Sequence, residues 1–249
     1  MDNSRGIVLY LHVHQPWRIR TYDIFDVATK HNYFSESASS DHDNELIFHK
    51  VAEKSYKPMN QLLEKLLSDH PEFKISLSIT GTFLEQAEAF DPSVLESFKR
   101  LVATGQVEIL SETYHHSLAF FYDRTEFEAQ VEKHRQKIRD TFGVETRVFR
   151  NTELAYNNDL AQWADGYGFE GIIAEGWDDV LGWRSPNYVY QPVNTSNIKL
   201  LMKNYRLSDD IAFRFSDRSW AEWPLTADTY HRWANTALTD APLLNLFMD

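Results

Sequence analysis

Residues 105–119 read GQVEILSETYHHSLA, and this stretch combines the two features that decide the fold. Gly105 ends a helical segment, and the short apolar run from Val107 to Leu110 that follows is typical of a β-strand. Acidic and histidine side chains, Glu112 and His116 among them, come directly after that run. We therefore expect a strand whose carboxyl end carries reactive groups.

The same arrangement of strand, polar residues and helix recurs along the chain. Helical spacing of apolar residues appears at 48–67, 83–90, 92–104 and 125–142, with Asp91 and Thr125 as the expected N-caps of the last two. Strands that alternate with helices indicate parallel strands joined by crossover connections. We predict one α/β domain over residues 1–249, a seven-stranded (β/α)7 TIM-like barrel that is incomplete at its C-terminus. The expected strands are 7–14, 75–79, 107–110, 147–150, 171–174, 198–203 and 243–248.

Composition narrows the classes of protein to which the chain can belong. The chain has 249 residues, no cysteine and a formal net charge of −12. Disulfides and thiolate metal sites are therefore excluded, and a nucleic-acid partner is not expected because it would need a basic face. Neither a signal peptide nor a membrane span is apparent, so we expect a cytoplasmic protein with no membrane partner. The sequence does not indicate an oligomeric state.

Six carboxylates stand where the expected strands end. Hydrolysis of a glycosidic bond with retention uses two carboxylates roughly 5–5.5 Å apart, one as nucleophile and one as acid/base. By position alone any two could serve, and any single one could instead cap the helix that follows it. The six are Glu112, Glu153, Glu175, Asp209, Asp210 and Asp249.

His12 and His14 alternate with apolar residues on the first strand, so both imidazoles should point to the same side. Two histidines on one face suit either a metal site or hydrogen bonds to sugar hydroxyls. A metal would need a third ligand, which Glu112, His116 or Asp249 could supply. Trp17, just beyond, could stack on a sugar ring or close the mouth of the barrel.

Four segments together resemble the signature regions of glycoside hydrolase family 57, in its α-amylase branch. They are HVHQP at 12–16, GQVEILSETYHHSLA at 105–119, FRNTELAY at 149–156 and LFMD at 246–249, and the resemblance runs from residue 7 to the end. It implies a retaining glycoside hydrolase acting on α-glucans or maltooligosaccharides, with Glu153 as the nucleophile. Asp249 falls where the family's D-x-E-x-F-G segment, which holds the acid/base, should begin.

The resemblance also implies roles for the remaining candidates. His12 and His14 would contact the sugar next to the cleaved bond, with Glu112 and His116 nearby, and catalysis would need no metal or other cofactor. Asp209 is the rival for the acid/base role. In the α-amylase branch, however, a similar LSDD segment lies apart from the catalytic aspartate, so Asp209 and Asp210 are expected to line the site.

Three other functions stay open at the level of sequence. If a sugar hydroxyl rather than water accepts the glycosyl group, the same site is a 4-α-glucanotransferase or branching enzyme. With His12, His14 and an acid as ligands, the chain would be a metal-dependent carbohydrate deacetylase. It could also be a barrel that binds sugars without turning them over.

We further expect the chain to be a fragment of a longer enzyme, with little or no activity as it stands. Asp249 is the last residue, so its side chain would neighbour the terminal α-carboxylate. An acid/base has to be held tightly by the residues around it, and terminal residues are rarely held so.

Overall fold

The computed structural model describes residues 5–34 and 41–248, which form an α/β fold with parallel strands. Each of the seven stretches expected to be a strand contains one. The strands are β1 (Gly6–Val13), β2 (Ile75–Ile79), β3 (Val107–Leu110), β4 (Val148–Arg150), β5 (Gly171–Ala174), β6 (Lys199–Met202) and β7 (Leu243–Met248).

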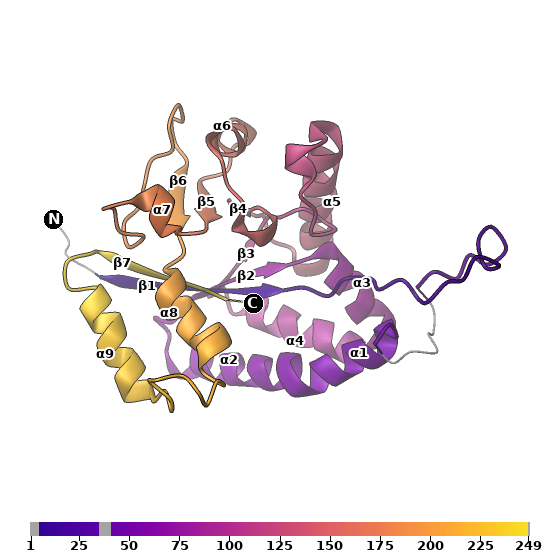
Figure 1. Ribbon diagram of the computed structural model, residues 1–249, viewed down its shortest axis with the longest axis horizontal. Coiled ribbons are helices and arrows are strands. Elements are labelled where there is room, and N and C mark those ends of the chain that lie inside the picture. The colour runs from indigo at the N-terminus through magenta and orange to yellow at the C-terminus, as the bar shows by residue number, and fades with distance from the viewer. Residues whose placement is uncertain (1–4, 35–40, 249) are drawn as a thin grey trace.

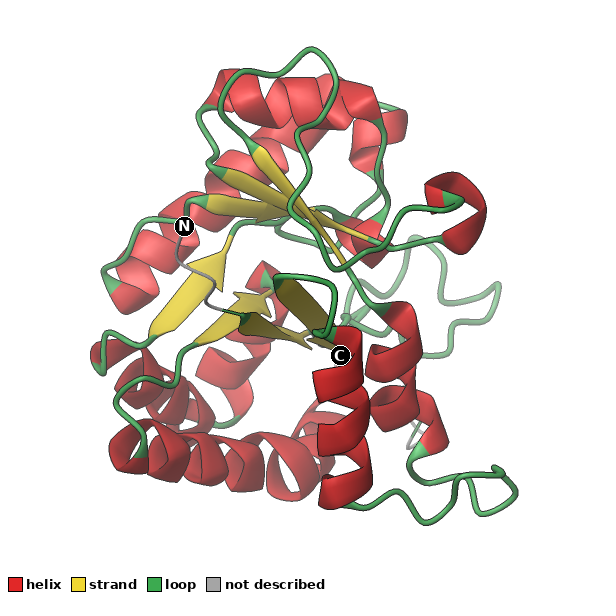
Figure 2. Ribbon diagram, turned by 90° about the vertical axis from the view of Figure 1, so that its left-hand side faces the viewer, coloured by secondary structure: helices red, strands yellow, loops and turns green. Residues whose placement is uncertain are grey.

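The strands divide into two sheets rather than one continuous barrel wall. One sheet has the order β3-β2-β1-β7 and the other the order β4-β5-β6. Figure 2 shows the two sheets facing one another, with helices on their outer sides. At one seam, β3 meets β4 through a single bridge between Ser111 and Phe149. The predicted α/β class is therefore confirmed, whereas the ladder that should join seven strands is interrupted.

The other seam, between β6 and β7, is held by an asparagine. The Asn245 side-chain amide donates to the Met202 carbonyl at 2.9 Å, and the Asn245 carbonyl accepts from the Asn204 N–H at 2.9 Å. Asn245 is fully buried. Its side chain thus replaces part of the missing strand pairing, because buried backbone groups need a partner.

The helices cover the outer faces of both sheets (Figure 1). The Asp91 cap before Pro92 is confirmed, whereas the cap of the helix at 124–142 is Asp123, which accepts from the N–H groups of Thr125 and Glu126. The helices are α1 (Asn44–Val51), α2 (Lys57–Asp69), α3 (Gly81–Phe90), α4 (Pro92–Ala103), α5 (Arg124–Phe142), α6 (Asn158–Tyr167), α7 (Asp178–Leu181), α8 (Tyr205–Asp209) and α9 (Ala227–Ala237), with the short π or 3-10 turns η1 (Ala52–Tyr56), η2 (Ala119–Phe121), η3 (Thr152–Leu154) and η4 (Asp210–Arg214).

The alternation of side chains along each strand decides what faces the interior. On β1, Leu9, Leu11 and Val13 pack into the core beneath the helices. Tyr10 faces the other way and joins a small interior cluster with residues of β3, β5 and β7. The next residues of the same parity, His12 and His14, therefore continue towards the interior at the carboxyl end of the strand.

In the described part of the chain, no helix is both long enough and apolar enough to cross a lipid bilayer.

Two glycines offer a matched test of the packing. A Cβ at Gly81 would lie 2.5 Å from three ring carbons of the buried Tyr114, whereas a Cβ at Gly166 in α6 would meet nothing within 4 Å. We expect Gly81→Ala to destabilise the protein by about 1–3 kcal/mol through overpacking. Gly166→Ala should be neutral or stabilising by up to about 1 kcal/mol, because alanine favours helix. Urea unfolding measures both, and a Gly81→Ala protein as stable as wild type would contradict the packing described here.

Candidate active site

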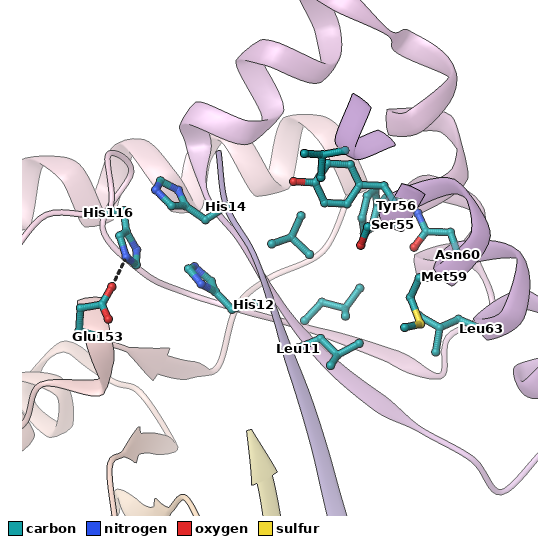
Figure 3. Close-up of a pocket in the computed structure, with 14 residues that line it drawn as sticks. Leu11, His12, His14, Ser55, Tyr56, Met59, Asn60, Leu63, His116 and Glu153 are labelled. Atoms are coloured by element: carbon teal, nitrogen blue, oxygen red, sulfur yellow. Dashed lines mark hydrogen bonds and ion pairs between the residues drawn. The ribbon is translucent and has the colours of Figure 1, made fainter. Parts of the chain in front are cut away.

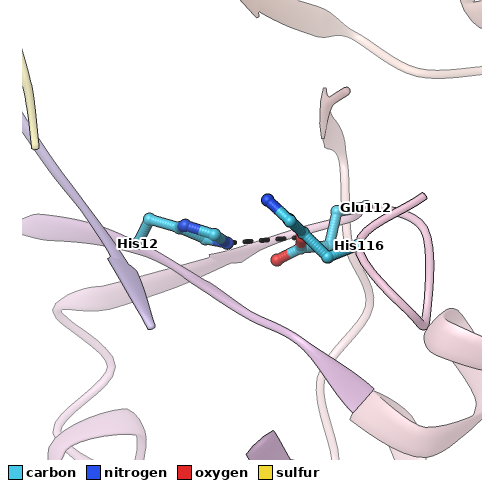
Figure 4. A group of neighbouring side chains, drawn as sticks. All are labelled: His12, Glu112 and His116. Atoms are coloured by element: carbon cyan, nitrogen blue, oxygen red, sulfur yellow. Dashed lines mark ion pairs between the residues drawn. The ribbon is translucent and has the colours of Figure 1, made fainter. Parts of the chain in front are cut away.

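Five of the residues predicted from sequence meet at the carboxyl ends of the strands. Figure 3 shows His12 and His14 from the end of β1, His116 from the loop after β3, and Glu153 from η3 after β4. Glu112 lies beside them and is fully buried (Figure 4). Reactive groups at this end of parallel strands are typical of TIM-like folds.

Glu112 is the charged centre of this cluster. The Ser78 hydroxyl donates to its Oε1 at 2.5 Å, and the Arg150 Nη1 donates to its Oε2 at 3.3 Å. His12 Nε2 and His116 Nδ1 lie 3.4 and 3.5 Å from the same Oε2. Burial by itself raises the pKa of Glu112, but the neighbouring His12 and Arg150 outweigh it and hold that pKa well below its usual value. The buried side chain is therefore an ionised carboxylate.

The three imidazoles of the site form a stack. Ring centroids are 5.8 Å apart for His12 and His14, and 4.3 Å apart for His14 and His116. Burial and the neighbouring His116 and His12 lower the pKa of His14 to about 4. His14 is therefore neutral at pH 7, with its Nδ1 3.0 Å from the Thr80 hydroxyl.

Glu153 is presented to solvent by an unusual backbone. Its φ of 56° is in the left-handed region, and His116, which it contacts, has a φ of 56° as well. Side chains other than glycine rarely adopt this conformation, and residues that do so cluster at functional sites. The Glu153 side chain is 71% exposed, and its Oε1 lies 2.9 Å from His116 Nε2. The carboxylate is thus accessible but oriented.

Glu153 lies between two hollows. One is a cavity of about 410 Å³ that passes His12, His14 and His116 and extends towards η1 and α2. The other, of about 250 Å³, lies on the interior side and is lined in part by Arg150, Glu175, Lys203, Phe213 and Met248. Apolar and aromatic side chains with a few polar and charged groups among them are typical of a ligand-binding cleft.

Lys203 connects two of the acids that the sequence places at strand ends. Its Nζ lies 3.5 Å from Glu175 Oε2 and 3.1 Å from Asp209 Oδ1. Gly176 makes room for this residue, because a Cβ there would lie 2.1 Å from the Lys203 carbonyl oxygen. Glu175 therefore joins the wall of the interior cavity as half of an ion pair.

The expected strand-end placement of Asp209 and Asp210 is wrong. Asp209 ends α8 and Asp210 begins η4, because Asn204 caps a helix directly after β6. Asp210 forms an ion pair with Arg214 one turn later. Asp209 reaches the cavity wall only through Lys203.

Trp17 lies outside this cluster. Trp17 donates from Nε1 to Glu85 at 3.0 Å and packs against Phe34 and Phe90, and it is not among the residues that line the two cavities at Glu153. Its contact with sugar stays a prediction. Asp249 lies outside the described residues, although Met248 before it lines the interior cavity with Glu153.

Sequence reasoning missed Arg150 and Lys203. Both follow the inward parity of their strands, because the residues two positions earlier, Val148 and Leu201, pack against the interior cluster. Strand alternation therefore predicts that both side chains point inward, but a single basic residue at the end of a strand does not by itself indicate a place in the site.

His12, Glu112 and His116 present ligand atoms within 4.8 Å of one another, a spacing that a metal ion could use. However, Arg150 Nη1 lies 3.3 Å from Glu112 Oε2 and 3.2 Å from His116 Nδ1. A fixed guanidinium at these two atoms repels a second cation and already satisfies the carboxylate. The donor set therefore fits a hydrogen-bonded network better than a metal site.

Comparisons with known proteins identify a matching family model and similar sequences and structures. The model of glycosyl hydrolase family 57 matches residues 8–249. An α-amylase candidate from Methanocaldococcus jannaschii is 45% identical over 244 residues, which are 98% of this chain and 50% of that protein. The chain thus spans about half the length of this relative.

Two solved structures show the same fold at low sequence identity. The 4-α-glucanotransferase of Thermococcus litoralis superposes with a TM-score of 0.70 at 17% identity, over 99% of this chain and 34% of that one. A candidate polysaccharide deacetylase from Mycobacterium smegmatis gives a TM-score of 0.59 at 13% identity, over 97% of this chain and 75% of that one. At these identities the likeness concerns fold alone.

The lowered pKa of His14 predicts how stability depends on pH. Between pH 6.5 and about 4, the unfolded chain takes up a proton at His14 that the folded protein does not, so the free energy of unfolding decreases as the pH falls. His14→Gln should lose less stability than wild type over this range. Urea unfolding at pH 7 and pH 5 measures the difference. His134, whose pKa burial also lowers, should preserve part of the dependence. Equal losses in the two proteins would refute the assignment.

Proposed function

This chain belongs to glycosyl hydrolase family 57, and on that premise we propose that it forms the catalytic barrel of a retaining glycoside hydrolase that cleaves α-1,4-glucans. The observation that carries the proposal is the position of Glu153, which follows β4 and borders both cavities. A nucleophile has to reach the anomeric carbon of a sugar that extends to both sides of the cleaved bond, and this position allows it. The two sheets would then act as one (β/α)7 wall around the substrate.

In the proposed reaction, Asp249 donates a proton to the leaving glycosidic oxygen while the Glu153 carboxylate attacks the anomeric carbon. Water, activated by Asp249 as base, then releases the sugar from Glu153. β7 supports this assignment because Phe247 lies in the interior cluster and lines the cavity that Glu153 borders, and strand alternation would direct a residue two positions later to the same side. If a sugar hydroxyl replaces water, the same steps transfer the glycosyl group to another glucan.

Binding of the substrate would use the groups that line the interior cavity. Lys203 and Glu175 offer hydrogen bonds to hydroxyls, and the exposed Phe213 offers a flat apolar face. His12 and His14 would contact the sugar from the other side of Glu153. Arg150 also argues against a metal-dependent deacetylase, because it places a fixed positive charge beside the histidine and carboxylate ligands.

Glu153→Ala tests the nucleophile. Turnover of maltooligosaccharides should fall by roughly 10⁴-fold or more while the fold is kept, because loss of a covalent nucleophile is rarely compensated. Azide should restore part of the turnover and yield a β-glycosyl azide. Glu175→Ala is the matched control, since it removes another strand-end acid, and azide should not rescue it. Near-normal activity of Glu153→Ala would disprove the assignment.

The role of the histidines has a separate test. Because Arg150 occupies the position beside Glu112 and His116, activity should survive dialysis against a strong chelator such as EDTA. Metal analysis of the dialysed protein provides the control. Loss of activity that zinc restores would favour a metal-dependent hydrolase instead.

A further inference from the structure

His116 stands between the proposed nucleophile and a buried ion pair. Its Nε2 lies 2.9 Å from Glu153 Oε1. On the opposite side of the ring, Nδ1 lies 3.2 Å from Arg150 Nη1 and 3.5 Å from Glu112 Oε2. The dashed line in Figure 3 marks the first contact, and Figure 4 shows the ring beside Glu112.

The chemistry of these partners fixes where the proton of His116 lies. A guanidinium donates hydrogen bonds and cannot accept them. The contact of Arg150 with Nδ1 is therefore a hydrogen bond only if Nδ1 carries a lone pair. A proton on Nδ1 would point at the guanidinium instead, with only the longer contact to Glu112 in return. The neutral ring with its proton on Nε2 satisfies both sides at once.

We propose that Arg150 is a positioning residue that holds His116 in its Nε2–H tautomer, so that His116 donates to Glu153 Oε1 and aims the nucleophile. This inference rests on the function proposed for Glu153. With Oε1 engaged by His116, attack on the anomeric carbon comes from Oε2.

Aromatic and charged neighbours hold the His116 ring and its partner Arg150 in place. The His14 ring is stacked on it at 4.3 Å, and the His12 ring at 4.9 Å. Arg150 is buried, with 3% of its residue surface exposed, and its guanidinium is charged at every accessible pH. The carboxylate of Glu112 balances Arg150 and anchors it between β3 and β4.

NMR tests the tautomer directly in the unmodified protein. Long-range ¹H–¹⁵N spectra of the imidazoles at pH 7 should show His116 with an unprotonated Nδ1 and a protonated Nε2. The His116→Gln spectrum assigns the signals. Arg150→Met should shift the Nδ1 signal towards the protonated value, because the donor that keeps it unprotonated is gone. A wild-type His116 protonated at Nδ1, or at both nitrogens, would overturn the proposal whether or not Arg150→Met folds.

Kinetics separate positioning from substrate binding. His116→Ala should lower kcat by about 10²-fold with little change in KM, because a misplaced nucleophile slows the chemical step. His116→Gln, whose amide can donate to Glu153, should recover at least part of that loss. His115→Gln is the matched control, because His115 lies beside Lys133 rather than Glu153, and should retain wild-type kcat.

The outcomes distinguish this inference from the proposed function. A raised KM with unchanged kcat in His116→Ala would show a sugar contact and refute the positioning role. Failure of Glu153→Ala to lose activity would refute the proposed nucleophile, while the NMR result would still decide the tautomer.

Discussion

The carboxylate of Glu112 is the buried charge on which the arrangement of the candidate site depends. An ionised group without solvent has to be matched by partners, or its desolvation would cost several kcal/mol. Here the partners come from different parts of the fold: Ser78 from β2, His12 from β1 and Arg150 from β4, while Glu112 itself lies in the loop after β3. Satisfying one side chain therefore sets the relative positions of four segments, including the two that meet at the weak seam between the sheets.

Rigid support of this kind lets the site hold two residues in an unfavourable backbone conformation. His116 and Glu153 both have positive φ, which costs on the order of 1–3 kcal/mol each and persists only where the surroundings enforce it. The seam bridge at Ser111 and Phe149 lies just before both residues, and Arg150 connects them to Glu112. The exposed carboxylate of Glu153 is thus supported by the buried ion pair between Arg150 and Glu112.

Much of this arrangement can be predicted from the spacing of apolar residues along the sequence and from the polar residues that follow them. Apolar runs located all seven strands, and alternation placed His12 and His14 on one face. The ion-pair partners of charged residues are harder to predict from sequence. Arg150 and Lys203 pair with acids on neighbouring parts of the fold, and those neighbours depend on the order of the strands. The break into two sheets depends on hydrogen-bond registers that hydrophobic patterning does not encode. Asp209 lies at the end of a helix rather than at the end of a strand, because the Asn204 side chain caps α8 directly after β6.

The pairing of β1 with β7 has a consequence for how the protein is made. Gly6 pairs with Leu243 and Leu11 with Met248, so β1 leaves the ribosome well before the strand that covers its second edge. Until then the nascent chain carries GIVLYLHV as an open strand edge next to β2, a surface on which other chains can add. Slow translation of the intervening segments would lengthen the time for which this edge is exposed. A holdase chaperone that binds apolar strands would cover the edge during that time.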